Sequence, residues 1–142
     1  MGVERLRFLV GQWRGEGRVR DGRATAAVTG TYRREDGAIA LVHETRVVGG
    51  EGAGLPPHRE RIVLRERRGR LRAFVRPDGG AEQEFIGEVT PAGFRFTHQS
   101  KQGEVTWELT PVGEDAWSER FLVVEEGAPV EVVTLRHERA EG

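Results

Sequence analysis

The chain contains no cysteine, which excludes disulfide bonds and thiolate metal sites. No apolar run approaches the roughly 20 residues that a membrane-spanning helix needs, and residues 1–5 lack the basic and then apolar pattern of a secretory signal. Asparagine is absent, and Lys101 is the single lysine among 22 basic residues. This bias fits a heat-adapted (thermophile) source or a GC-rich genome, and composition does not separate the two. We expect a cytoplasmic protein with no membrane partner.

The net charge is also close to zero, because 22 basic and 23 acidic residues leave a formal charge of -1. The two signs alternate along the chain, which argues against a nucleic-acid partner, since such a surface needs a basic excess on one face. The most basic tract, residues 59–72, is interrupted by Glu60 and Glu66 and is interpreted as a solvated sheet face. With 142 residues and no internal repeat or linker, the chain is predicted to form one domain, 1–142.

The most informative segment is residues 12–20, where polar and non-polar positions alternate without a break. Trp13, Gly15, Gly17 and Val19 fall on one face, and the charged or amide side chains fall on the other. Side chains of a strand point alternately to its two faces, so this segment is predicted to be a strand with one dry face. Glycines on that face allow another group to approach the backbone closely.

The rest of the chain reads as β structure, except for a short helical segment at Val3–Val10. Strands are predicted at 12–20, 24–34, 38–48, 58–66, 70–76, 82–89, 93–99, 104–110, 116–125 and 130–138. Short connections between successive strands favour antiparallel neighbours, and a sheet of this size closes to remove its edges. The fold class is therefore all-β, a ten-stranded antiparallel up-and-down barrel. A two-sheet sandwich would need long crossovers, and only Gly49–Pro57 is long enough.

Several polar residues, including three histidines and Glu119, lie at the alternate strand positions that otherwise carry apolar side chains. They are therefore predicted to point to the apolar face. Buried polar groups without partners cost about 1–3 kcal/mol each, so their convergence indicates mutual pairing or a cavity. The phase of His43 and that of strand 130–138 remain ambiguous from the sequence, and His58 is expected to be exposed. The predicted ligand-binding residues are Trp13, His43, Phe94, Phe96, His98, Trp107, Trp117, Phe121 and His137.

Motifs of stronger chemistry are missing from the chain. There is no HExxH motif, no glycine-rich loop opening a helix, and no Gly-x-Ser-x-Gly turn. Three separated histidines could reach one point, but their spacing does not support a metal site. We therefore predict no catalytic residue and no metal.

Residues Leu9–Gly17, with the sequence Leu-Val-Gly-Gln-Trp-Arg-Gly-Glu-Gly, resemble the opening of nitrobindin-like and related lipocalin-like bacterial barrels of the fatty-acid-binding-protein group. The similarity covers the whole chain in pattern and is specific over Gly11–Gly17. It implies a barrel, and it implies His137 as a candidate proximal ligand of haem. Two features depart from nitrobindins. Val-Arg-Asp-Gly at 19–22 replaces a Tyr-Pro-Thr-Ile-type segment, and Glu138 and Arg139 follow His137.

Four hypotheses follow from these observations. The first is a barrel that binds a small apolar ligand without catalysis and without a cofactor. The second is a nitrobindin-like haem protein that binds nitric oxide or peroxynitrite. The third is a small isomerase or lyase with a cavity histidine as general base. The fourth is a homodimer formed through outward-facing apolar residues, which are Val42, Val48, Phe74, Leu122 and Val124.

Overall fold

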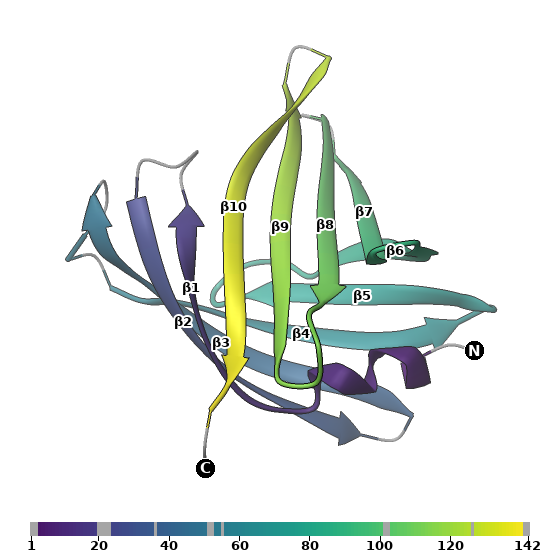
Figure 1. Ribbon diagram of the computed structural model, residues 1–142. Helices are drawn as coiled ribbons and strands as arrows, with labels where there is room; N and C mark the ends of the chain where they lie inside the picture. Colours follow the sequence, from purple (N-terminus) through teal and green to yellow (C-terminus); the bar gives the residue numbers. More distant parts are fainter. Residues whose placement is uncertain are drawn as a thin grey trace.

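The computed structural model shows an all-β protein, a closed barrel of ten antiparallel strands with one short helical segment (Figure 1). It describes residues 3–19, 24–35, 37–50, 53–54, 56–100, 103–125 and 127–140. A 3-10 helix, η1, spans Val3–Leu9. The strands are β1 (Gly11–Val19), β2 (Ala24–Glu35), β3 (Ala38–Gly50), β4 (His58–Arg67), β5 (Arg70–Pro77), β6 (Gln83–Thr90), β7 (Gly93–Ser100), β8 (Gly103–Pro111), β9 (Ala116–Glu125) and β10 (Ala128–Arg139).

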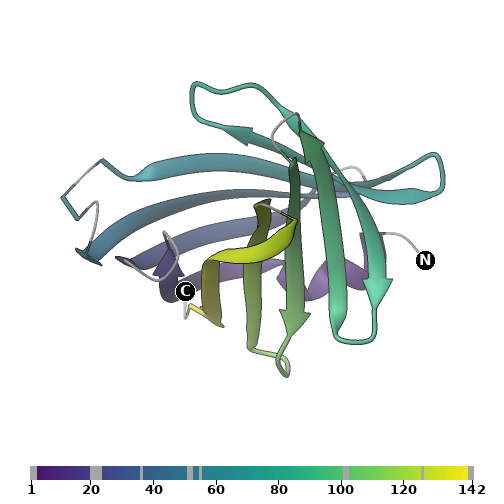
Figure 2. The same ribbon diagram turned by 90° about the horizontal axis from the view of Figure 1, so that it is seen from above.

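The predicted barrel is confirmed, and the ten predicted strands agree with these bounds to within two residues. Each strand pairs with its neighbours along the chain, and β1 also pairs with β10, which closes the sheet. In this register Gly15 lies between Val28 of β2 and His137 of β10. Seen from above, the strands curve around a common interior (Figure 2). A meander of this kind needs no crossover, because antiparallel neighbours join through short hairpins.

The turn between β4 and β5 shows how local sequence sets a hairpin. Arg68 and Gly69 both have positive φ angles, 54° and 76° respectively. Positive φ at both central residues defines the turn type whose twist matches the twist of the flanking strands. Gly69 adopts this conformation without a steric penalty, whereas Arg68, which has a Cβ atom, adopts it at a small steric cost.

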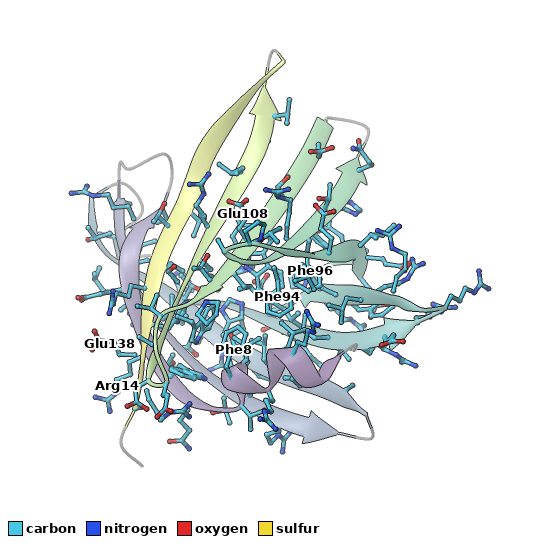
Figure 3. All side chains as sticks on the ribbon, turned by 45° about the vertical axis from the view of Figure 1, so that its right-hand side comes forward. Phe8, Arg14, Phe94, Phe96, Glu108 and Glu138 are labelled. Atoms are coloured by element: carbon cyan, nitrogen blue, oxygen red, sulfur yellow. The ribbon has the colours of Figure 1, made fainter. Side chains whose placement is uncertain are left out.

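One end of the barrel is closed by η1, whose residues contact β3 and β4. Leu6 and Leu9 are fully buried there, and the indole Nε1 of Trp13 donates a hydrogen bond to the Leu9 carbonyl at 2.7 Å. Phe8 stacks on Phe94 with ring centroids 6.0 Å apart, and both rings lie near η1 (Figure 3). The aromatic core at this end consists of Trp13, Tyr32, Phe85, Phe94, Phe96, Trp107 and Trp117.

The outer wall carries the charged residues, as the alternation predicts. Arg14 and Glu138 project away from the barrel interior (Figure 3). Arg95 pairs with Glu88 and Glu108 across neighbouring strands. Exposed pairs of this kind contribute little to stability, about 0–1 kcal/mol each, so the interior accounts for most of the stability of the fold.

Candidate functional site

A cavity of about 470 Å³ opens at the barrel end opposite η1. Its lining includes Val19 at the end of β1 and His58 at the start of β4, positions that share one rim in an antiparallel meander. The volume lies within the range usual for small-molecule sites. The lining residues are Val19, His43, Thr45, Val47, Pro56, His58, Glu60, Val105, Glu119, Phe121, Val123, Val133 and Leu135.

Inward-facing side chains of different character follow one another along the barrel axis, and β9 shows their order. Trp117 belongs to the aromatic core, Glu119 follows, and Phe121 and Val123 continue toward the open rim. The same order occurs on β3, where Leu41 lies in the core, and His43 lines the cavity. A layer of polar residues therefore lies between the aromatic core and an apolar mouth. This polar layer consists of the cavity-lining residues His43, Glu60 and Glu119, together with two buried groups beside Glu119: His137 and the hydroxyl of Tyr32, whose ring belongs to the aromatic core.

His43 and Glu60 form the closest pair in the polar layer. They are directly opposite each other in the register of β3 and β4, so both side chains point to the same face. The Nε2 of His43 donates to Oε1 of Glu60 at 2.6 Å, and both side chains are largely buried. The Oε2 of Glu60 lies 3.5 Å from Nε2 of His58, whose side chain is more exposed at the rim.

Burial and this pairing act in opposite directions on the two pKa values. Burial lowers the pKa of His43, but the hydrogen bond and the charge of Glu60, together with the charge of Glu119, outweigh it and raise the pKa above its usual value. Burial raises the pKa of Glu60, but the hydrogen bond and charge of His43, with a smaller effect of His58, lower it overall. The pair is therefore stabilised as imidazolium and carboxylate inside the cavity.

Glu119 and His137 form the second pair of the polar layer. The Nε2 of His137 lies 3.6 Å from Oε2 of Glu119, which is too long for a hydrogen bond, and this nitrogen has no hydrogen-bond partner. Only 3% of His137 and 5% of Glu119 is exposed. The imidazole stacks on the indole of Trp117, with centroids 3.9 Å apart and planes 11° apart.

Tyr32 completes the polar layer from β2. Burial raises the pKa of its hydroxyl well above the ordinary value, and the charges of Glu119 and Glu60 raise it further. The hydroxyl is therefore neutral at physiological pH. The rings of Tyr32 and Trp117 pack edge to face, with centroids 5.7 Å apart.

The structure separates the nine residues predicted to bind ligand into three groups. His43 and Phe121 line the cavity. His98 is half-buried at the end of β7, where its Nδ1 hydrogen-bonds to the Glu84 carbonyl at 2.9 Å. The other six are buried and are not among the residues that line the cavity; they are Trp13, Phe94, Phe96, Trp107, Trp117 and His137.

The sequence interpretation missed Glu60, which it placed in a solvated basic tract. The signal that could have found it is the two-residue spacing Glu60, Ile62 and Leu64, since Ile62 and Leu64 are buried. Tyr32 was missed as well. His58 is exposed as expected, with 58% of its side chain accessible, but it also contributes to the cavity rim.

A haem bound through His137 does not fit the residues present. Its Nδ1 side lies over Gly15, its face is covered by Trp117, and its Nε2 faces the Glu119 carboxylate. His137 is not among the residues that line the cavity, so a haem iron would have to displace Glu119 to reach Nε2. Across the described ranges, no group of three or more histidine and acidic side chains is arranged to hold a metal ion.

The outward apolar residues do not form one uniform patch. Val42 and Val48 are exposed by 49% and 58%, whereas Phe74, Leu122 and Val124 are half-buried. The homodimer through these residues stays a prediction.

Comparison with known proteins supports the barrel fold. No protein-family model matches the chain, and no curated protein matches it. Among solved structures, it is similar to the crystal structure of Rv2717c from M. tuberculosis, with a TM-score of 0.68, 17% sequence identity, and coverage of 98% of this chain and 97% of that chain. At this identity the likeness establishes a shared barrel fold alone. The nitrobindin-like and lipocalin-like resemblance fits that fold loosely, and membership of either family stays a prediction.

In the part of the chain that the structure describes, no helix has the length and apolar character to cross a membrane. The cytoplasmic location stays an expectation from the sequence.

Proposed function

We propose that this protein binds a small, largely apolar molecule in the cavity at the open end of the barrel. The observation that carries the proposal is the layered cavity itself, of about 470 Å³, with an apolar mouth above a polar layer. Sites for small molecules combine apolar walls with a few polar groups that orient the ligand. The apolar part of the lining is Val19, Val47, Pro56, Val105, Phe121, Val123, Val133 and Leu135.

Filling the cavity tests the proposal. Nile red, a neutral apolar dye whose emission rises in apolar surroundings, is expected to bind the wild-type protein saturably at one site. Val133→Trp places an indole in the cavity mouth and is expected to weaken dye binding by about tenfold or more, equivalent to roughly 1.4 kcal/mol. Val48→Trp puts the same side chain on the exposed outer wall and is the matched control. Equal dye affinity in the wild type and Val133→Trp would contradict binding in this cavity.

A second candidate function is proton transfer on a ligand in the same cavity, as an isomerase or lyase reaction. The His43–Glu60 pair favours it, because the carboxylate orients the ring and raises its pKa, so that His43 holds a proton below that pKa and accepts one readily above it. Since Glu60 occupies Nε2, Nδ1 is the remaining nitrogen of His43. The test is exchange of ketone α-protons with D2O, which the wild type should accelerate and His43→Gln should not. No acceleration by the wild type would remove this candidate.

A further inference from the structure

The cavity holds more carboxylates than cations, because Glu60 is paired with His43 and Glu119 is a second carboxylate of the lining. Among the residues that the structure describes, its lining contains two carboxylates, Glu60 and Glu119, and no arginine or lysine. The two lining histidines, His43 and His58, both lie within 3.5 Å of Glu60, and the charge of Glu119 also acts on His43. Within the described part of the lining, no arginine or lysine is therefore available to pair with an anionic head group.

Glu119 is the carboxylate best placed to receive a ligand. It lies on the floor of the cavity, directly above Trp117 along β9, and is almost fully buried. The nearest imidazole, that of His137, stays 3.6 Å away and makes no hydrogen bond through Nε2. A buried carboxylate needs a charged or hydrogen-bonding partner, because removing it from water costs several kcal/mol otherwise.

The order of the layers determines how a ligand enters. A ligand passing the apolar mouth reaches the polar layer with its leading end, while its hydrocarbon part stays against Phe121, Val123 and Val133. The leading group then lies beside Glu119 and near Glu60. An anionic head, such as that of a fatty acid, would add a third carboxylate to this layer. A protonated amine would instead form a charge-assisted hydrogen bond there.

We propose that the ligand is an apolar amine, whose protonated nitrogen binds at Glu119 on the cavity floor and whose hydrocarbon part fills the mouth of the barrel. This inference rests on the cavity-binding function proposed above. It assigns the ligand class from the sign of the cavity charges and the depth at which they lie.

Three probes of equal chain length separate the ligand classes: octylamine, 1-octanol and octanoate. Isothermal titration calorimetry with the full chain is expected to show affinity in the order amine, alcohol, acid, with about tenfold or more between amine and acid. Glu119→Gln keeps the shape of the side chain and is expected to abolish the advantage of the amine over the alcohol. Glu138→Gln removes an exposed carboxylate on the outer wall and should leave the order unchanged.

The outcomes of the titrations distinguish a wrong ligand class from a wrong cavity function. Octanoate binding as tightly as octylamine would overturn the amine assignment and leave the cavity function standing. If none of the three probes nor Nile red binds, the cavity function itself fails. Should Glu119→Gln not fold, the wild-type order of the three probes still decides the ligand class, and Glu60→Gln provides a second variant in the same layer.

Discussion

The absent side chain of Gly15 makes room for the imidazole of His137. The two residues are direct partners in the pairing of β1 with β10, and a Cβ atom on Gly15 would lie 2.7 Å from Cε1 of the imidazole. The ring cannot move away on its other side, because Trp117 stacks on it at 3.9 Å. This glycine of the Gly-x-Trp-x-Gly-x-Gly segment is therefore required by contact between the first and last strands.

We expect Gly15→Ala to lower the free energy of unfolding by about 1–3 kcal/mol, the usual cost of overpacking a core. Urea unfolding monitored by tryptophan fluorescence measures the change. The cost should shrink in a His137→Ala background, because the clash is then absent, and a double-mutant cycle gives the coupling. Equal costs in both backgrounds would show that the imidazole is not the obstacle.

Glu60→Gln is expected to lower the pKa of His43. The Glu60 carboxylate is the main group that raises this pKa, with a smaller effect of Glu119, and without Glu60 the effect of burial prevails. The imidazole proton resonances, followed by NMR against pH, report the change directly. Glu44→Gln is the matched control, because Glu44 on the same strand as His43 pairs instead with Arg59. An unchanged His43 pKa in Glu60→Gln would contradict the pairing.

The same pair contributes to stability over a limited pH window. The raised pKa of His43 gives a contribution that is complete below about pH 6.5 and is lost as the pH rises through the folded-state pKa. The lowered pKa of Glu60 gives one that is present above about pH 4.3 and is lost as the pH falls through the folded-state pKa. The stability difference between wild type and Glu60→Gln should therefore be largest near about pH 5–6. Chemical unfolding of both proteins at pH values across this range measures how the stability difference depends on pH.

Arg139 joins three segments at the closed end of the barrel. Its guanidinium lies 4.3 Å from the centre of the Trp13 ring and donates hydrogen bonds to the carbonyls of Val10 and Glu114. Arg139→Ala is expected to lower the free energy of unfolding by about 1–2 kcal/mol. Arg139→Lys keeps the charge but loses the planar fork, so it should recover only part of the loss. Full recovery with lysine would mean that charge alone matters.

Addition of ferric haem tests the geometry around His137. Because Trp117, Gly15 and Glu119 enclose this imidazole, no Soret band that depends on His137 is expected. His137→Ala should instead destabilise the fold by about 2–4 kcal/mol, since it leaves space beside Trp117 and removes the neighbour of a buried carboxylate. A sharp Soret band in the wild type that disappears in His137→Ala would restore the haem hypothesis.

Much of the strand structure of the barrel could be predicted from the sequence. Two-residue alternation is a local property of a strand, so the inward phase of Trp13 and the bounds of all ten strands could be read directly. The ambiguous phase of His43 was settled only by its pairing across β3 and β4, which places it opposite Glu60. The nine predicted site residues all belong to strands, but alternation says nothing of their height along the barrel axis.

The sequence by itself determined the number of strands, their order and, where the alternation is clear as in β1, which side chains face inward, because each depends on residues that are close along the chain. Only the tertiary structure decided that the tryptophans form a packed core while valines surround the open end. It also decided that Gly15 meets His137, which is 122 positions away along the chain. Such contacts depend on the stagger between strands when the sheet closes, and no local pattern encodes that stagger.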